Sequence, residues 1–418
     1  MAQAPRETEA SDAGSFRFKP YDGNDIQYPG FGFDIQFQDS KSRARVGKLK
    51  TPHGTIETPN FIFCGTKANI KSLQPQQVKE AGADIVLANT YHLMIQPGAD
   101  IVEKMGGLHE FMQWDGPILT DSGGFQIYSM GDGTDADEIK GRNNKTERAR
   151  SLNKITEKGA SFRSYKDGSK LFLSPESAME IQRKLGPDFV VQLDECTAMH
   201  VSREYTEKSM HMSHRWGDRS LKAFEKTHDG KQAVYGVVQG GVYQDLREES
   251  AAYTASRPFF GTALGGTFGG NFDQFFEIVS WCMPNLAQER PVHLLGIGTF
   301  KDVFECVRLG IDTFDCVSPT RIARHGWALM KGAPGERLNL RNAKYKEDKE
   351  PLWPELGIPA SANYSKAYLH HLIRAGEHLG GQIIAQHNIA VFAHLMKEIR
   401  KAIQNDTLDA LQKEWLVE

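Results

Sequence analysis

An aspartate at the end of an apolar run, with basic residues after it, is the first feature that could carry out chemistry. Asp315 lies in the stretch Ile311–Gly326, where apolar residues surround it before Pro319 interrupts the pattern. Arg321 and Arg324 follow within a few residues. A carboxylate at a strand end, next to a basic loop, suits nucleophilic attack on an electrophilic carbon of an anionic substrate. Asp315 is therefore the candidate nucleophile.

Other apolar runs also end in polar or glycine-rich segments. Asp121 is followed by Ser-Gly-Gly, a sequence that lets backbone amides approach a ligand, and then by Phe125, which could cover a planar base. Asp194 and Gln239 end two further runs, and Gly265–Thr267 ends another. A carboxylate accepts from two N–H groups, whereas a carboxamide both donates and accepts. Asp194 and Gln239 therefore match the edge of a guanine-like heterocycle, to which Gly265–Thr267 would add backbone groups.

Each of these residues also has an ordinary structural explanation. A single aspartate at a strand end is more often a helix cap or a turn residue, but three of them beside glycine loops indicate an active site. Phe125 could instead be a core residue, and Gln239 could stabilise its own loop. Asn89 is placed to hold Asp121 by a hydrogen bond, and Asp312 is expected to be structural.

The elements that must position these residues are strands that alternate with helices. Eight short apolar runs recur along the chain, at residues 60–64, 84–89, 117–121, 188–194, 233–239, 262–265, 293–298 and 311–317. Helical patterns lie between them. This alternation predicts parallel βαβ units, and eight units predict a closed (β/α)8 TIM barrel, whose catalytic groups lie at the carboxyl ends of the strands. An open doubly wound sheet is the alternative, but no GxGxxG motif follows the first strand.

The rest of the chain is divided around this barrel. Residues 1–32 are rich in Ala, Ser, Gly, Asp and Pro without apolar periodicity, which predicts a disordered N-terminal extension. The catalytic barrel is predicted over residues 33–326; it begins with β-hairpins and contains a charged insertion at residues 131–168. Residues 327–418 are predicted to form a C-terminal helical subdomain that completes the barrel.

The composition is that of a soluble globular protein. The net charge of −3 gives no global basic field, so any nucleic acid must be bound by a local patch. The five cysteines include no CxxC pair, which argues against a disulfide framework or a cysteine zinc site. No apolar run approaches the roughly 18 residues needed to cross a membrane, and the N-terminus lacks the apolar core of a signal peptide. A cytoplasmic protein without membrane association is expected.

Several longer motifs occur in a fixed order: NTYHL at 89–93, LTDSGGFQ at 119–126, LSPE at 173–176, DECT at 194–197, VQG at 238–240, LGIG at 295–298, FDC at 314–316 and PTR at 319–321. Together they resemble the tRNA-guanine transglycosylase (queuine/preQ1 tRNA-ribosyltransferase) family, from about residue 42 to the C-terminus. The resemblance implies a (β/α)8 pentosyltransferase that acts on the tRNA anticodon loop. It would exchange guanine at the wobble position for a 7-deazaguanine base such as preQ1, or for queuine.

The resemblance also implies a role for each candidate residue. Asp315 would be the nucleophile that forms a covalent ribose intermediate, and Asp121 the general acid and base. The base would be recognised by Asp194, Ser122, Gln239, Gly266 and Thr267, and sandwiched between Phe125 and Leu295. Arg321 and Arg324 would contact the uridines that flank the target nucleotide.

Two segments depart from the family pattern. The structural zinc site of the family has three cysteines and a histidine, but Leu356, Ile358 and Ser361 stand at the cysteine positions, beside His387. Leucine and isoleucine cannot ligate a metal, so neither a zinc site nor another cofactor is expected.

The loop that follows residue 264 differs as well. Thr267 stands where the family usually has leucine, and Phe268 where it has a small residue. Gly269 leaves room that favours the larger queuine, while Cys196 is the choice of the preQ1-type enzymes, so the incoming base stays open.

Other functions also remain open at this level: a non-catalytic RNA-binding subunit of a heterodimeric transglycosylase, a DNA base-exchange enzyme, and a barrel hydrolase of sugars. The presence of both Asp121 and Asp315 argues against the first, and the match around Pro319–Arg321 favours tRNA. The resemblance further implies a homodimer.

Overall fold

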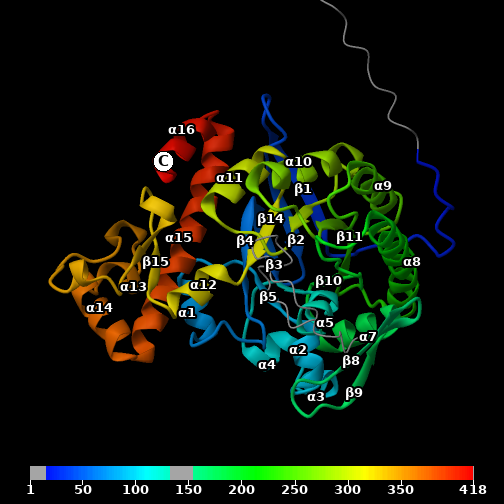
Figure 1. Ribbon diagram of the computed structural model, residues 1–418, viewed down its shortest axis with the longest axis horizontal. Helices are drawn as coiled ribbons and strands as arrows, with labels where there is room; N and C mark the ends of the chain where they lie inside the picture. Colours follow the sequence, from blue (N-terminus) through cyan, green and yellow to red (C-terminus); the bar gives the residue numbers. More distant parts are fainter. Residues whose placement is uncertain (1–15, 132–153, 418) are drawn as a thin grey trace, which may run out of the picture.

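Eight parallel strands close into a barrel, as the sequence predicts (Figure 1). The structure, a computed structural model, describes residues 16–131 and 154–417. The strands follow one another around the barrel in chain order: β4 Asn60–Cys64, β5 Val86–Ala88, β6 Ile118–Thr120, β10 Phe189–Val191, β11 Ala233–Val238, β12 Gly261–Leu264, β13 Val292–Leu294 and β14 Thr313–Cys316. Pairing of β14 with β4 closes the ring. Each strand overlaps one of the eight predicted apolar runs.

Helices connect the strands and cover the outside of the barrel (Figure 1). They are α1 Pro75–Glu80, α2 Thr90–Ile95, α3 Ala99–Lys104, α4 Gly107–Met112, α5 Gly124–Gly131, α7 Pro175–Leu185, α8 Arg203–Thr227, α9 Gln244–Ala255, α10 Phe272–Cys282 and α11 Phe300–Arg308, with a 3-10 turn at Met283–Asn285. Local sequence sets their ends: α7 begins where Ser174 accepts from Ser177 N and ends at Gly186, whose φ is 67°. Among the described residues, none of the helices is long and apolar enough to cross a membrane.

A three-stranded antiparallel sheet, β1 Gly32–Gln38, β2 Arg45–Thr51 and β3 Gly54–Thr58, lies at the amino ends of the barrel strands. It confirms the predicted hairpins. Leu49 and Ile56 belong to the apolar cluster that also contains side chains of the barrel strands. The turn between β2 and β3 carries His53, which contacts Asp188 just before β10. The sheet therefore covers the end of the barrel opposite to the predicted site.

Residues 16–31 differ from the expected disordered extension. Ile26 is buried in an apolar cluster with Leu221 and Phe224 of α8, and the Tyr28 hydroxyl donates to Pro258 O at 2.7 Å. This segment is fixed by contacts with distant residues, which the local composition does not report. Residues 1–15 of the predicted extension lie outside the described residues.

The described part of the predicted insertion forms a second antiparallel sheet, made of β7 Lys154–Thr156, β8 Gly159–Arg163 and β9 Lys170–Leu173. Residues 132–153 lie outside the described residues, and the sheet continues past the predicted boundary at residue 168. The ring of Phe162 lies 5.2 Å from that of Tyr91 on α2. The sheet therefore packs beside the carboxyl end of β5.

The C-terminal region lies against one side of the barrel (Figure 1). Its elements are α12 Ser318–Ala323, β15 Trp327–Leu329, β16 Arg337–Asn339, α13 Pro359–Ala362, α14 Lys366–Ala375, α15 His378–Gln404 and α16 Leu408–Trp415, with 3-10 turns at Pro334–Glu336, Ala343–Tyr345 and Pro354–Leu356. The long helix α15 packs on β4, where the rings of Phe392 and Phe61 stack at 4.1 Å.

Candidate active site

Asp315 lies on β14 and is held as a carboxylate by three neighbours. Its Oδ1 accepts a hydrogen bond from Gly296 N at 2.9 Å and lies 3.2 Å from His293 Nε2. Its Oδ2 accepts from the thiol of Cys64 at 3.4 Å. Burial acts to raise the pKa of Asp315, but the imidazole, the amide and the thiol outweigh it and hold this pKa below its usual range. The side chain is therefore ionised at neutral pH, as a nucleophile must be.

Asp121 follows β6 and has the opposite character. Its Oδ2 accepts from Asn89 Nδ2 and from Gln126 Nε2, the latter at 2.7 Å, and its Oδ1 accepts from Thr90 N at 2.9 Å. The bond from Asn89 confirms the role expected for that residue. Burial raises the pKa of Asp121 to about 6, with a contribution from the charge of Asp315, against these hydrogen bonds. A carboxyl group with such a pKa can exchange a proton near neutral pH.

Asp194 and Gln239 meet at the carboxyl ends of β10 and β11. Gln239 Nε2 donates to Asp194 Oδ2 at 2.6 Å, and Ser122 Oγ donates to Asp194 Oδ1 at 3.3 Å. Burial raises the pKa of Asp194 to about 6, and the charge of Asp121 adds to this effect. Gln239 Oε1 is buried without a hydrogen-bond partner among the described residues. The Asp194 carboxyl oxygens are thus hydrogen-bond acceptors that lie beside the Gln239 amide, and this amide can turn toward a ligand.

The loop Gly265–Thr267 after β12 lies next to Gln239. A Cβ added at Gly266, whose φ is +81°, would collide with Gln239 Oε1, and one added at Gly265 would lie 3.4 Å from the Leu295 side chain. The Thr267 hydroxyl donates to Thr197 O at 2.6 Å and is buried. Of the predicted base-binding residues, Thr267 therefore uses its hydroxyl in a bond within the protein, whereas Gly266 borders Gln239 and Leu295 borders Gly265.

Phe125 and the two arginines are placed by the helices that follow β6 and β14. Phe125 lies in the first turn of α5, next to Gly124, where an added Cβ would contact Asp194. Arg321 is on α12 and Arg324 immediately follows it; both are exposed. All the residues predicted for the site thus lie at the carboxyl ends of the barrel strands.

His293 and Cys64 are neighbours of Asp315 that sequence reasoning missed. His293 lies on β13 and is fully buried, with its Nδ1 3.0 Å from Thr313 Oγ1. Cys64 is the last residue of β4. A signal was present for Cys64, because it ends a predicted apolar run as Asp121 and Asp194 do. His293 had no such signal, since it begins its predicted apolar run.

The arrangement places an ionised carboxylate and a protonatable carboxyl group at one rim. Their pKa values are moved in opposite directions, so one carboxyl group stays ionised while the other can exchange a proton near neutral pH. Beside them, Asp194, Ser122 and Gln239 form a polar group that suits a planar, hydrogen-bonding ligand.

This chain is similar to known proteins of one family over most of its length. The family model described as Queuine tRNA-ribosyltransferase matches residues 39–418. The chain belongs to the queuine tRNA-ribosyltransferase family. A queuine tRNA-ribosyltransferase of Roseiflexus sp. is 45% identical over 394 residues, which cover 92% of this chain and 98% of the relative. One from Natranaerobius thermophilus is 43% identical over 375 residues, covering 90% and 95%. The predicted family and the predicted class of enzyme, a pentosyltransferase, are confirmed.

The residues at the zinc position of the queuine tRNA-ribosyltransferase family do not fit a metal. Ser361 Oγ lies 2.9 Å from His387 Nδ1, and His387 Nε2 lies 2.8 Å from Leu329 O. The carbonyl can only accept, so Nε2 donates and Nδ1 accepts from the serine. Burial lowers the pKa of His387 to about 4, which keeps the ring neutral. Leu356 and Ile358 pack against the apolar core and offer no donor atoms.

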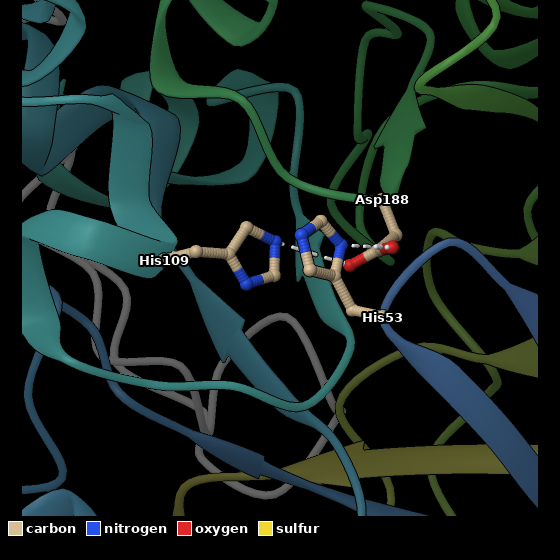
Figure 2. A group of neighbouring side chains, drawn as sticks. All are labelled: His53, His109 and Asp188. Carbon is tan, nitrogen blue, oxygen red and sulfur yellow. Dashed lines mark hydrogen bonds and ion pairs between the residues drawn. The ribbon is translucent and has the colours of Figure 1, made fainter.

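One other group of possible ligands lies at the opposite end of the barrel. His53, His109 and Asp188 place three ligand atoms within 4.8 Å of one another, and among the described residues no second group of this kind is found (Figure 2). The two imidazole rings stack at 3.5 Å with 15° between their planes. An ion bound by both nitrogens would lie out of the plane of each ring, which histidine coordination does not favour. The contacts instead describe a hydrogen-bonded carboxylate.

Proposed function

We propose that this chain exchanges guanine in the tRNA anticodon loop, at the wobble position, for a 7-deazaguanine base or queuine. The observation that carries the proposal is the pair of carboxyl groups with opposite pKa shifts, Asp315 and Asp121, beside the pocket of Asp194 and Gln239. Membership of the queuine tRNA-ribosyltransferase family supports the choice of substrate.

In the first half-reaction the Asp315 carboxylate attacks C1′ of the ribose. A new ester bond forms between an Asp315 oxygen and C1′ while the bond from C1′ to guanine breaks, so guanine leaves with the electron pair. Guanine is a poor leaving group as an anion, and protonated Asp121 supplies the proton that it needs. The thiol of Cys64 and the amide of Gly296 orient the nucleophile.

In the second half-reaction the incoming base takes the place of guanine. Asp121, now ionised, removes a proton from the ring nitrogen of that base as the nitrogen attacks C1′. The ester to Asp315 breaks and the carboxylate is restored. The sugar carbon is thus displaced twice, as in retaining glycosidases.

Recognition of the base is assigned to the polar pocket. Asp194, when ionised, accepts from the ring N–H and the exocyclic amine of a guanine-like base, and Gln239 with the backbone of Gly266 contacts the carbonyl edge. Phe125 and Leu295 cover the two faces of the ring. Ser122 holds Asp194 in place.

Recognition of the RNA is assigned to Arg321 and Arg324, which are exposed at the same end of the barrel. A net charge of −3 gives no general affinity for nucleic acid, so the contacts must be local. An unpaired loop suits such a site because its nucleotides can be extruded for a few kcal/mol.

Incorporation of labelled guanine into tRNA by the purified chain tests the function. We expect exchange into tRNA that contains a guanine at the wobble position, and none into tRNA without it or into DNA. Exchange by this chain alone excludes a non-catalytic subunit, and release of guanine without a second base would reveal a hydrolase. Absence of exchange with every base would overturn the proposal.

The incoming base is decided by direct competition. Phe268 turns its ring into the core, where it lies 5.4 Å from that of Phe275, so the bulk of this residue is kept away from the pocket. We propose that queuine is accepted. Exclusive uptake of labelled preQ1 into tRNA would contradict this.

We propose further that the C-terminal subdomain is stable without zinc. The buried hydrogen bonds of His387 to Ser361 and Leu329, with packing of Leu356 and Ile358, take over the cross-linking role. We expect less than 0.1 zinc per chain by elemental analysis, and an unfolding temperature that chelators do not change. One zinc per chain would contradict it.

A homodimer is the proposed assembly. The aromatic pair Tyr364 and Tyr368 stacks at 5.9 Å at the start of α14, and Tyr368 is 40% exposed. Exposed aromatic groups of this kind are enriched at protein interfaces. Light scattering should give twice the 46.7 kDa of the chain, and Tyr368→Glu should give the monomer.

A further inference from the structure

Arg247 is a fully buried arginine on α9, with a relative exposure of 0%. Among the residues that the structure describes, no carboxylate lies within ion-pair distance of its guanidinium group. Burial lowers the pKa of Arg247, and an unpaired buried charge is costly unless hydrogen bonds compensate it. The hydrogen bonds of the Arg247 side chain therefore indicate its role.

All of its hydrogen bonds go to backbone carbonyl groups of two loops. At the end of β11 and in the loop after it, Arg247 Nε donates to Gly241 O at 2.7 Å, and Nη1 makes a longer contact of 3.4 Å with O of Val238, the last residue of β11. On the loop after β12, Nη1 donates to Gly265 O at 2.8 Å and Nη2 to Thr267 O at 2.7 Å. One planar group thus ties together two successive strand ends of the barrel.

The segments that Arg247 ties are those that carry the proposed base contacts. Gln239 lies between Val238 and Gly241, and Gly266 lies between Gly265 and Thr267. One turn further along α9, Ser250 Oγ accepts from Gln239 N at 3.0 Å. We call Arg247 and Ser250 the α9 clamp. Through it, α9 holds both sides of the pocket from behind.

A purely structural role would be met by a simpler group. Replacing buried ionic groups by apolar side chains is often neutral or stabilising, and lysine offers a single point of donation where arginine offers a rigid fork. The guanidinium also lies 5.0 Å from the centre of the Phe268 ring, a contact that a single ammonium group could make as well. The fork matches the spacing of the carbonyl groups of Gly241, Gly265 and Thr267, which belong to the loops around the pocket.

We infer that the α9 clamp is a positioning device for the base pocket: Arg247 and Ser250 set the separation of Gln239 and Gly266. Neither residue touches the base or the ribose. The inference rests on the proposed base exchange, because it concerns the affinity for the free base. It goes beyond the family assignment by naming residues behind the pocket that determine that affinity.

The test is the split of kinetic constants in Arg247→Lys. We expect KM for guanine to rise by about tenfold, as for a lost well-placed hydrogen bond. The KM for tRNA and kcat at saturating guanine should change less than threefold, because the clamp does not contact Asp315 or Asp121. Ser250→Ala should raise KM for guanine by about threefold. Equilibrium titration with guanine should give the same two ratios.

Arg257→Lys is the matched control. Arg257 lies just past the other end of α9, is 5% exposed, and donates to Asp218 Oδ1 at 2.7 Å and to Ser256 Oγ at 3.0 Å. Its replacement should lower the unfolding temperature as Arg247→Lys does but leave KM for guanine unchanged.

Equal effects of Arg247→Lys and Arg257→Lys on KM for guanine would overturn the inference, and so would a uniform loss of kcat. If Arg247→Lys does not fold, an unchanged KM for guanine in folded Ser250→Ala overturns it equally. Failure of the wild-type chain to exchange any base would refute the proposed function instead, which keeps the two outcomes distinct.

Discussion

Asp188 at the amino end of the barrel and Asp121 at the carboxyl end have pKa values shifted in opposite directions. At the amino end, Asp188 accepts from His53 Nδ1 at 2.8 Å and from Ile118 N at 2.9 Å, and lies 3.3 Å from His109 Nε2 (Figure 2). Burial acts to raise the pKa of Asp188, but these neighbours lower it to about 2. At the carboxyl end, burial raises the pKa of Asp121 to about 6.

Burial alone does not decide between these outcomes. Imidazoles, which can carry positive charge, face Asp188, whereas Asp121 receives only neutral donors and faces the charge of Asp315. Asp312, also at the amino end, is bound by Arg45 at 2.6 and 2.8 Å, which confirms its structural role. Asp188 is therefore held as a charge, whereas Asp121 can exchange a proton near neutral pH.

The largest expected effect is on catalysis, from Asp121→Asn. The amide can neither protonate the leaving guanine nor deprotonate the incoming base, so exchange should fall by about 10² to 10⁴-fold. Single-turnover exchange measures it. The fold should persist, as circular dichroism would show. Activity within tenfold of wild type would contradict the acid and base role.

At the other end, Asp188→Ala should affect stability and not chemistry. It leaves His53 Nδ1 and Ile118 N without their buried acceptor, which costs about 3 kcal/mol of unfolding free energy. Denaturant unfolding measures this, and kcat at 25 °C should stay within twofold. Asp115→Ala, which removes an exposed ion pair with Lys79 in the same region, is the control and should not change stability measurably.

Asp194 and Asp188 should contribute to stability with opposite dependence on pH. The raised pKa of Asp194 means that its stabilising contribution is present below pH 4 and lost as the pH rises through about 6. The unfolding free energy of Asp194→Asn should therefore rise relative to that of wild type between pH 4 and 7, by on the order of 2 kcal/mol.

The lowered pKa of Asp188 gives stability that is present above pH 4 and lost as the pH falls toward 2. The unfolding free energy of Asp188→Asn should therefore fall less steeply below pH 4 than that of wild type. Unfolding free energies measured at each pH provide the comparison, and parallel curves for the two variants would contradict it.

The smallest effect is expected from Phe125→Leu. Loss of an aromatic face against the base costs about 1 kcal/mol, a rise in KM for guanine of about fivefold. Leu295→Met, which conserves the volume of the side chain, is the matched variant, and its KM for guanine should stay within threefold of the wild-type value. If both variants behave alike, Phe125 does not stack on the base.

Much of the site could be predicted because its residues end apolar runs. Asp121, Asp194 and Gln239 each follow a barrel strand, Asp315 lies near the end of β14, and a closed barrel brings the carboxyl ends of its strands to one rim. The count of eight runs was enough to predict that closure. Local sequence therefore determined both the fold and the carboxylates.

The remaining features depend on contacts between distant residues. His293 meets Asp315 only because β13 and β14 pair side by side, and Arg247 reaches the β12 loop only because α9 packs behind it. The packing of residues 16–31 on α8 is likewise absent from any local periodicity. The direction of a pKa shift belongs to this class too, since it is set by which donors the fold brings together.

The covalent step is the central claim, and trapping it is the most direct test. Labelled tRNA incubated with the chain and then denatured should give a protein–RNA band on a denaturing gel, and peptide mapping should place the RNA on Asp315. Asp315→Asn should give no band and no exchange. A band that persists in Asp315→Asn, or maps to another residue, would contradict the account.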